Sequence, residues 1–171
     1  MKMALGFILC LSLGTWVVAD EIRGRVVAIA DGDTITVLDV NQVQRKIRLE
    51  GIDAPEKKQA FGTRSRQTLG DLVAGKDVTV QWNKKDRYGR IIGHVYLGDR
   101  DIDMEMVQAG MAWHYRQYSK SAELAAAEAE ARKDRLGLWA DANPVPPWAF
   151  RKAKKKKTPQ PLLPRKITTV G

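Results

Sequence analysis

The feature of this sequence that most restricts its fold is a repeated alternation of apolar and polar residues in short segments. The segments are rich in β-branched residues and cover 22–30, 34–38, 43–49, 76–82 and 91–97. A period of two places successive side chains on opposite faces of a strand, so one face of each segment is expected to be buried. Short polar turns separate the first three segments, which predicts three consecutive antiparallel strands.

Helical patterns interrupt and follow these strands. They cover residues 61–73, 103–110 and 121–135, and either Asp101 or Asp103 is suited to cap the second helix. Five strands with one helix between them and two helices after them predict an α+β fold. The predicted architecture is a five-stranded Greek-key β-barrel of the OB type with three α-helices.

The first 19 residues have the pattern of a secretory signal peptide. Lys2 precedes an apolar run that ends in small residues at Ala19. A membrane anchor is the alternative, but the run is shorter than the roughly 20 residues that a spanning helix needs. The single cysteine, Cys10, lies in this segment, so the mature chain would have no thiols. We expect export to the periplasm or the extracellular medium, without membrane insertion after cleavage.

Positive charge is concentrated at the C-terminal end. The chain has a formal charge of +9, and residues 151–171 hold eight Lys and Arg residues and no acidic residue. Because Lys2 accounts for the remaining charge, residues 20–150 are formally neutral. We expect 20–150 to form one domain and 151–171 to be a basic, disordered tail that binds polyanions.

One acidic turn follows the third predicted strand. Arg48 lies near the end of that strand, and Pro55 restrains the turn that carries Asp53 and Glu56. The Ala54 carbonyl lies between these two carboxylates, so the turn offers only hard oxygen ligands. Taken alone, the composition also suits an ordinary solvated turn.

A second acidic turn and a second arginine change this interpretation. The Asp-Gly-Asp-Thr sequence at 31–34 joins the first two predicted strands, and Arg90 ends the Asp-Arg-Tyr-Gly-Arg sequence at 86–90. Two arginines and three carboxylates could therefore converge. Oxygen ligands without nearby histidine or cysteine favour calcium or magnesium over zinc, and guanidinium groups match phosphate oxygens.

Four blocks of sequence together carry a family resemblance. Residues 31–34, 48–56, 86–90 and 137–139 resemble, in this order, the signatures of the staphylococcal (micrococcal) nuclease-like family, the thermonucleases. The resemblance implies the same barrel fold. It also implies a secreted, calcium-dependent nuclease that hydrolyses phosphodiester bonds of DNA, RNA or both through metal-assisted attack by water.

The resemblance also implies a role for each side chain of the two turns. Asp33 and Asp53 would bind Ca²⁺ together with the backbone carbonyl of Ala54. Glu56 would act as general base or position the attacking water. The arginines expected to bind the phosphate and stabilise the transition state are Arg48 and Arg90.

The same resemblance places aromatic and basic side chains against the substrate, a single-stranded or denatured DNA or RNA. We expect the protein to be a monomer. Two other classes of function stay open. One is an inactive OB module that only binds single strands, and the other is an envelope-associated structural protein whose tail binds acidic polymers. The residues expected to contact the nucleotide are Tyr88, Tyr115, Arg116 and Tyr118.

Overall fold

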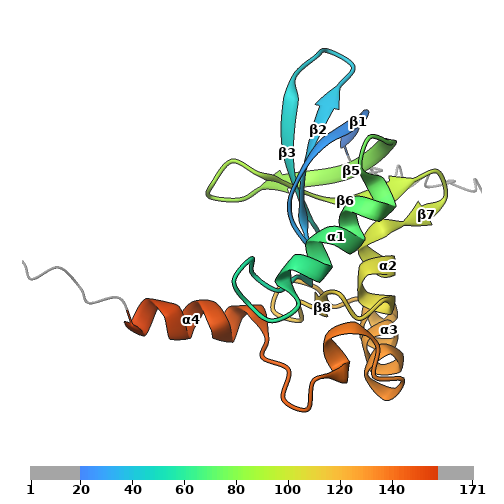
Figure 1. The fold of residues 1–171 in the computed structure, drawn as a ribbon. Helices are drawn as coiled ribbons and strands as arrows, with labels where there is room; N and C mark the ends of the chain where they lie inside the picture. Colours follow the sequence, from blue (N-terminus) through green and yellow to red (C-terminus); the bar gives the residue numbers. More distant parts are fainter. Residues whose placement is uncertain (1–19, 158–171) are drawn as a thin grey trace, which may run out of the picture.

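A computed structural model describes residues 20–157 of the protein. Its main element is a closed β-barrel, seen in the upper part of Figure 1. The strand order is β3-β2-β1-β5-β6-β7, and a parallel pairing of β3 with β6 closes the sheet. The predicted five-stranded barrel of the OB type is confirmed. Its strands are β1 (Asp20–Asp31), β2 (Thr34–Asp39), β3 (Gln44–Leu49), β5 (Asp77–Lys85) and β6 (Ile91–Leu97).

The long strand β1 belongs to both sides of the barrel. Its first half pairs with β5 and its second half pairs with β2, both antiparallel. Two register shifts interrupt the pairing with β2, after Val26 and after Ile29. Such irregularities bend a strand and increase its twist, which allows the sheet to curl until β3 meets β6. The bent end of β1 leads directly into the first acidic turn.

One apolar core fills the barrel and extends under the helices. Helix α1 (Gly62–Val73) packs against β1, and α2 (Ile102–Gln108) packs against both β6 and α3 (Ala122–Lys133). Asp101 caps α2 by accepting a hydrogen bond of 3.0 Å from the Met104 N–H. Burial of each large apolar side chain contributes about 1.5–3 kcal/mol. Fully buried members include Ile35, Val37, Ile47, Leu69, Val73, Val80, Val95 and Met106.

A fourth helix, α4 (Pro147–Lys157), corrects the sequence prediction of three helices followed by a disordered tail. Pro147 stands at the first helical position, where its fixed φ favours helix formation and its missing N–H costs nothing. Residues 151–157 of the predicted tail are therefore helical. In Figure 1, α4 extends to one side, away from the barrel.

The remaining elements are short, and the two ends of the chain lie outside the described residues. These elements are β4 (Ile52–Asp53), β7 (Arg100–Asp101), β8 (Trp113–His114) and the 3₁₀ turn η1 (Gly137–Ala140). The predicted signal peptide, 1–19, and residues 158–171 are not described, so the signal peptide stays a prediction. Within 20–157, no helix is long and apolar enough to cross a membrane.

Candidate active site

The first acidic turn is buried against α1 and the second turn. Gly32 is required there, because a Cβ atom at this position would lie 1.8 Å from the Ser65 hydroxyl and 2.8 Å from the Ala54 Cβ. Asp33 is only 5% exposed. Its carboxylate accepts a hydrogen bond of 2.9 Å from the Thr34 hydroxyl and one of 2.7 Å from the Ala54 N–H. The two turns predicted to form the site are therefore in direct contact.

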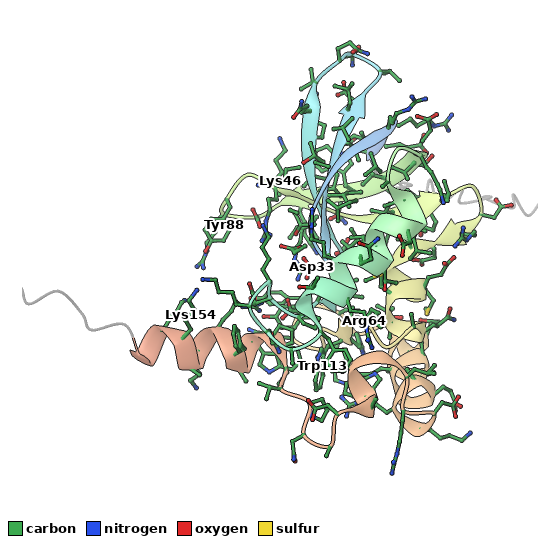
Figure 2. All side chains as sticks on the ribbon, in the orientation of Figure 1. Asp33, Lys46, Arg64, Tyr88, Trp113 and Lys154 are labelled. Atoms are coloured by element: carbon green, nitrogen blue, oxygen red, sulfur yellow. The ribbon has the colours of Figure 1, made fainter. Side chains whose placement is uncertain are left out.

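Arg48 joins the carboxylates of both turns through one nitrogen. Its Nη2 lies 2.9 Å from Asp53 Oδ1 and 3.1 Å from Asp33 Oδ2. Its Nη1 donates to the backbone carbonyls of Leu49 and Ile52, each at 2.9 Å. Asp53 itself is 1% exposed and lies on β4, which pairs with β8. Three of the predicted site residues thus meet in a buried cluster. Figure 2 labels Asp33, which marks the position of this cluster.

A second guanidinium, Arg151 of α4, binds the same cluster from the other end of the chain. Its Nη1 and Nη2 lie 3.1 Å from Oδ1 and 2.8 Å from Oδ2 of Asp53, a two-pronged pairing. Its Nη1 also donates to Oε1 of Glu56 at 2.8 Å. The sequence prediction of a disordered tail from residue 151 missed this role. The Pro-Trp-Ala-Phe sequence before Arg151 was the available signal, because proline and aromatic residues can start and anchor a helix.

Burial and charge set the ionisation of the acidic groups. Burial raises the pKa of Asp53, while the hydrogen bond from Arg151 and the charge of Arg48 oppose this rise. Burial and the neighbouring Asp33 raise the pKa of Asp31 to about 6. Carboxylates taken out of water this close together need positive charge nearby to stay ionised. In this structure the two guanidinium groups supply that charge.

These carboxylates also fit a hard divalent cation. Asp33 and Asp53 direct one oxygen each toward a shared positively charged atom, Nη2 of Arg48. Within residues 20–157, no group of three or more His, Cys, Asp or Glu side chains is arranged to hold a metal ion. A cation at Asp33 and Asp53 would therefore take its remaining ligands from backbone, water and substrate oxygens, as calcium and magnesium do.

Arg90 lies on the loop between β5 and β6, and its polar contacts are local. Its Nε donates to Asp86 Oδ2 at 2.7 Å, and its guanidinium lies 5.7 Å from the centre of the Tyr88 ring. Asp86 also accepts from the backbone N–H groups of Tyr88 and Arg90, which fixes the loop. Among the described residues, the terminal nitrogens of Arg90 have no hydrogen-bond partner. The structure therefore does not join Arg90 to the buried carboxylates.

The other predicted substrate residues differ in their distance from the cluster. Tyr115 follows β8 and donates its backbone N–H to the Gly51 carbonyl at 2.8 Å. Burial and the charge of Asp53 raise the Tyr115 pKa, as expected for a ring next to that carboxylate. Tyr118 packs edge-on against Tyr115 at 4.7 Å and is 66% exposed. Arg116 is turned toward Glu128, with Nη2 at 3.2 Å from Oε2.

Tyr88 and α4 lie on one side of the molecule. Figure 2 shows Tyr88 and Lys154 on the same side, with Asp33 toward the barrel. Tyr88 is 68% exposed. This side therefore offers an extended ligand both aromatic rings and cations near the acidic cluster, which is the combination that single-stranded nucleic acid binds.

Comparison with known proteins agrees with this arrangement. The sequence model described as staphylococcal nuclease homologue matches residues 46–141. A protein of Escherichia coli named an uncharacterized endonuclease is 49% identical over 148 residues, covering 85% of this chain and 96% of its own. A protein of Shigella flexneri named micrococcal nuclease is 46% identical over 166 residues, covering 91% and 93%.

A third relative, from Haemophilus influenzae and also named an uncharacterized endonuclease, is 47% identical over 131 residues, covering 77% of this chain and 74% of its own. The barrel, the acidic cluster and these similarities define a nuclease that hydrolyses phosphodiester bonds. The chain belongs to the family of staphylococcal nuclease homologues.

Proposed function

We propose that this nuclease is calcium-dependent and that it cleaves single-stranded or denatured DNA, RNA or both by direct attack of water. The observation that carries the proposal is the meeting of Asp33 and Asp53 at one nitrogen of Arg48, at 3.1 Å and 2.9 Å. Two buried carboxylates converge there from separate turns. Such a pair needs a positive partner, and an oxygen-ligand site favours calcium or magnesium.

In this proposal Asp33, Asp53 and the Ala54 carbonyl hold the cation. When bound, Ca²⁺ supplies a Lewis acid that polarises the phosphate and lowers the pKa of a coordinated water. The Ala54 N–H already holds one oxygen of Asp33 at 2.7 Å. This bond restrains the carboxylate and leaves less reorganisation for cation binding.

The arginines bind the phosphate with different donors. Arg90 presents its terminal nitrogens, while Arg48 has both of its terminal nitrogens on protein acceptors. Arg48 therefore keeps the two turns together and contributes Nε to the phosphate. Fixed donors directed at developing charge commonly supply the largest part of a barrier reduction.

Glu56 activates the water. Its side chain is 40% exposed, and Oε1 accepts a hydrogen bond from Arg151. Within the described residues Oε2 has no partner, so this oxygen can accept the proton of an attacking water. The Glu56 backbone N–H donates to Gln59 Oε1 at 3.1 Å, which fixes the start of the loop after Pro55.

The substrate strand lies along the aromatic side of the molecule. Tyr115 and Tyr118 stack with a nucleotide near Asp53, Arg116 pairs with a neighbouring phosphate, and Tyr88 contacts the strand beside Arg90. The lysines of α4 and the following residues hold longer polymers by releasing condensed counterions. We further propose that the protein is exported through its N-terminal signal and acts as a monomer in the periplasm or outside the cell.

An assay on denatured DNA and on RNA, with Ca²⁺ or with a chelator, tests this function. Cleavage with Ca²⁺ that stops with the chelator supports it. Binding of single strands without any cleavage would favour the inactive OB module. If the barrel neither binds nor cleaves nucleic acid, the result would favour a structural envelope protein.

A further inference from the structure

Arg151 occupies the acidic cluster as a cation would. Its two terminal nitrogens contact both oxygens of Asp53, at 3.1 Å and 2.8 Å, and one of them also contacts Glu56 at 2.8 Å. Its side chain is only partly exposed, at 38%, although it belongs to a helix near the C-terminal end. Arg151 also lies outside residues 46–141, the part matched by the family.

These contacts occupy three of the lone-pair positions of Asp53, and both carboxylate oxygens are engaged. A carboxylate has about four lone-pair positions for donors or ligands. Asp53 Oδ1 accepts from Arg48 and from Arg151, and Oδ2 accepts from Arg151. A calcium ion would approach the same lone pairs to about 2.3–2.6 Å, a distance at which a second cation on them is strongly repelled.

The same helix also contacts Tyr115, one residue of the predicted nucleotide-binding surface. The Trp148 ring lies parallel to the Tyr115 ring, with centres 5.3 Å apart and planes at 3°. Trp148 also meets Trp113 edge-on at 5.5 Å. Parallel stacking on Tyr115 is the contact that a nucleobase would make there. Arg151 and Trp148 are three residues apart on α4. Through Arg151 the helix contacts Asp53, which is predicted to bind the cation, and through Trp148 it contacts Tyr115, which is predicted to bind the nucleotide.

We propose that α4 is a latch on the active site, in which Arg151 holds Asp53 and Glu56 in the cation-free protein and a divalent cation displaces it. Release of Arg151 loosens Trp148 from Tyr115, so cation binding opens the surface on which the nucleotide stacks. The latch rests on the proposed function for the identity of the cation ligands. The latch adds Arg151 as a competitor of the cation, which lowers the apparent affinity of the acidic cluster for that cation.

Calorimetric titration of the protein with Ca²⁺ measures this competition. Arg151→Gln removes the two-pronged pairing, and Lys152→Gln is the matched control, because it removes the same charge from the neighbouring, exposed position on α4. The latch predicts that Arg151→Gln binds Ca²⁺ about tenfold more tightly than the wild type, which equals roughly 1.4 kcal/mol. Lys152→Gln should stay within about twofold of the wild type, a difference under about 0.5 kcal/mol.

Hydrogen exchange of the wild-type protein gives a second readout that needs no variant. The amides of α4 should exchange faster with Ca²⁺ than with a chelator, because the helix loses its contact with the cluster. Equal Ca²⁺ affinity of the wild type and Arg151→Gln, with unchanged exchange of α4, would overturn the latch while leaving the calcium site in place. No Ca²⁺ binding by either protein would overturn both the calcium site and the latch. Binding by Arg151→Gln alone would support the latch in its strongest form.

Discussion

Replacing Arg48 with lysine separates two roles that one guanidinium combines. Arg48 spans the cluster with four contacts between 2.9 and 3.1 Å, two to backbone carbonyls and two to the carboxylates of Asp33 and Asp53. A lysine carries the same charge on a single nitrogen and cannot bridge acceptors on both sides. The substitution therefore keeps the charge and removes the geometry.

The expected losses follow from these contacts. Loss of one preorganised donor to the transition state lowers kcat by about 10²–10³, or roughly 2.7–4 kcal/mol. Loss of a buried hydrogen bond to a charged group lowers the free energy of unfolding by about 1.5–3 kcal/mol. Arg48→Lys should show both effects, because the side chain is only 12% exposed.

Arg90→Lys is the matched control for this prediction. Arg90 pairs with Asp86 near the surface, with 28% of its side chain exposed, so its replacement should change the unfolding free energy by less than about 1 kcal/mol. Its kcat should still fall. Steady-state kinetics on a short oligonucleotide and urea unfolding measure both quantities. If kcat is unchanged and only KM rises for either variant, the replaced arginine contributes to substrate binding and not to transition-state stabilisation. An unchanged unfolding free energy for Arg48→Lys would contradict the bridging contacts of Arg48.

Three further predictions concern other parts of the chain. Glu56→Gln should lower kcat by about 10²–10⁴, and a loss under about tenfold would mean that Glu56 only positions the water. Ending the chain after Ala153 keeps Arg151 but removes six cations. Binding of long DNA should then weaken, and the salt slope of this binding should fall by about 0.7 for each phosphate that is no longer neutralised, while kcat on a short oligonucleotide stays within about twofold. An unchanged salt slope would refute the binding of nucleic acid by these cations. Burial raises the pKa of Asp103 to about 7, although the contact of 3.0 Å with His94 opposes this rise. The native state then keeps a proton that the unfolded chain releases above about pH 4, so the unfolding free energy falls as pH rises from about 4 to 7. Asp103→Asn should flatten that slope, by up to about 1.4 kcal/mol per pH unit in urea unfolding, and an unchanged slope would assign it to other groups.

Local sequence was sufficient to predict the barrel and the meeting of the two acidic turns. The period of two in the strands determines which side chains enter the core, and Pro55 restrains the turn that carries Asp53. Arg48 could be placed beside that turn because it lies only five residues from Asp53. In each case the interacting residues are near in sequence or belong to adjacent strands.

Arg151 could not be placed in the same way. It is 98 residues from Asp53, and its neighbours are lysines whose composition is typical of disorder. Its position depends on where Trp148 and α4 pack, which is a tertiary property. Arg90 shows the opposite case: the sequence suggested that it joins the cluster, but its loop keeps its side chain on Asp86.

The most direct test of the central claim is the rate of cleavage of one short single-stranded DNA as free Ca²⁺ is raised, for the wild type and Asp53→Asn. Because Asp53 is buried and is proposed to bind the cation directly, we predict that the wild-type rate rises with Ca²⁺ and returns to background on chelation. Asp53→Asn should remain at least about a hundredfold slower at every Ca²⁺ concentration. Wild-type cleavage that persists in the chelator, or full activity of Asp53→Asn, would contradict a cation-dependent mechanism at this cluster.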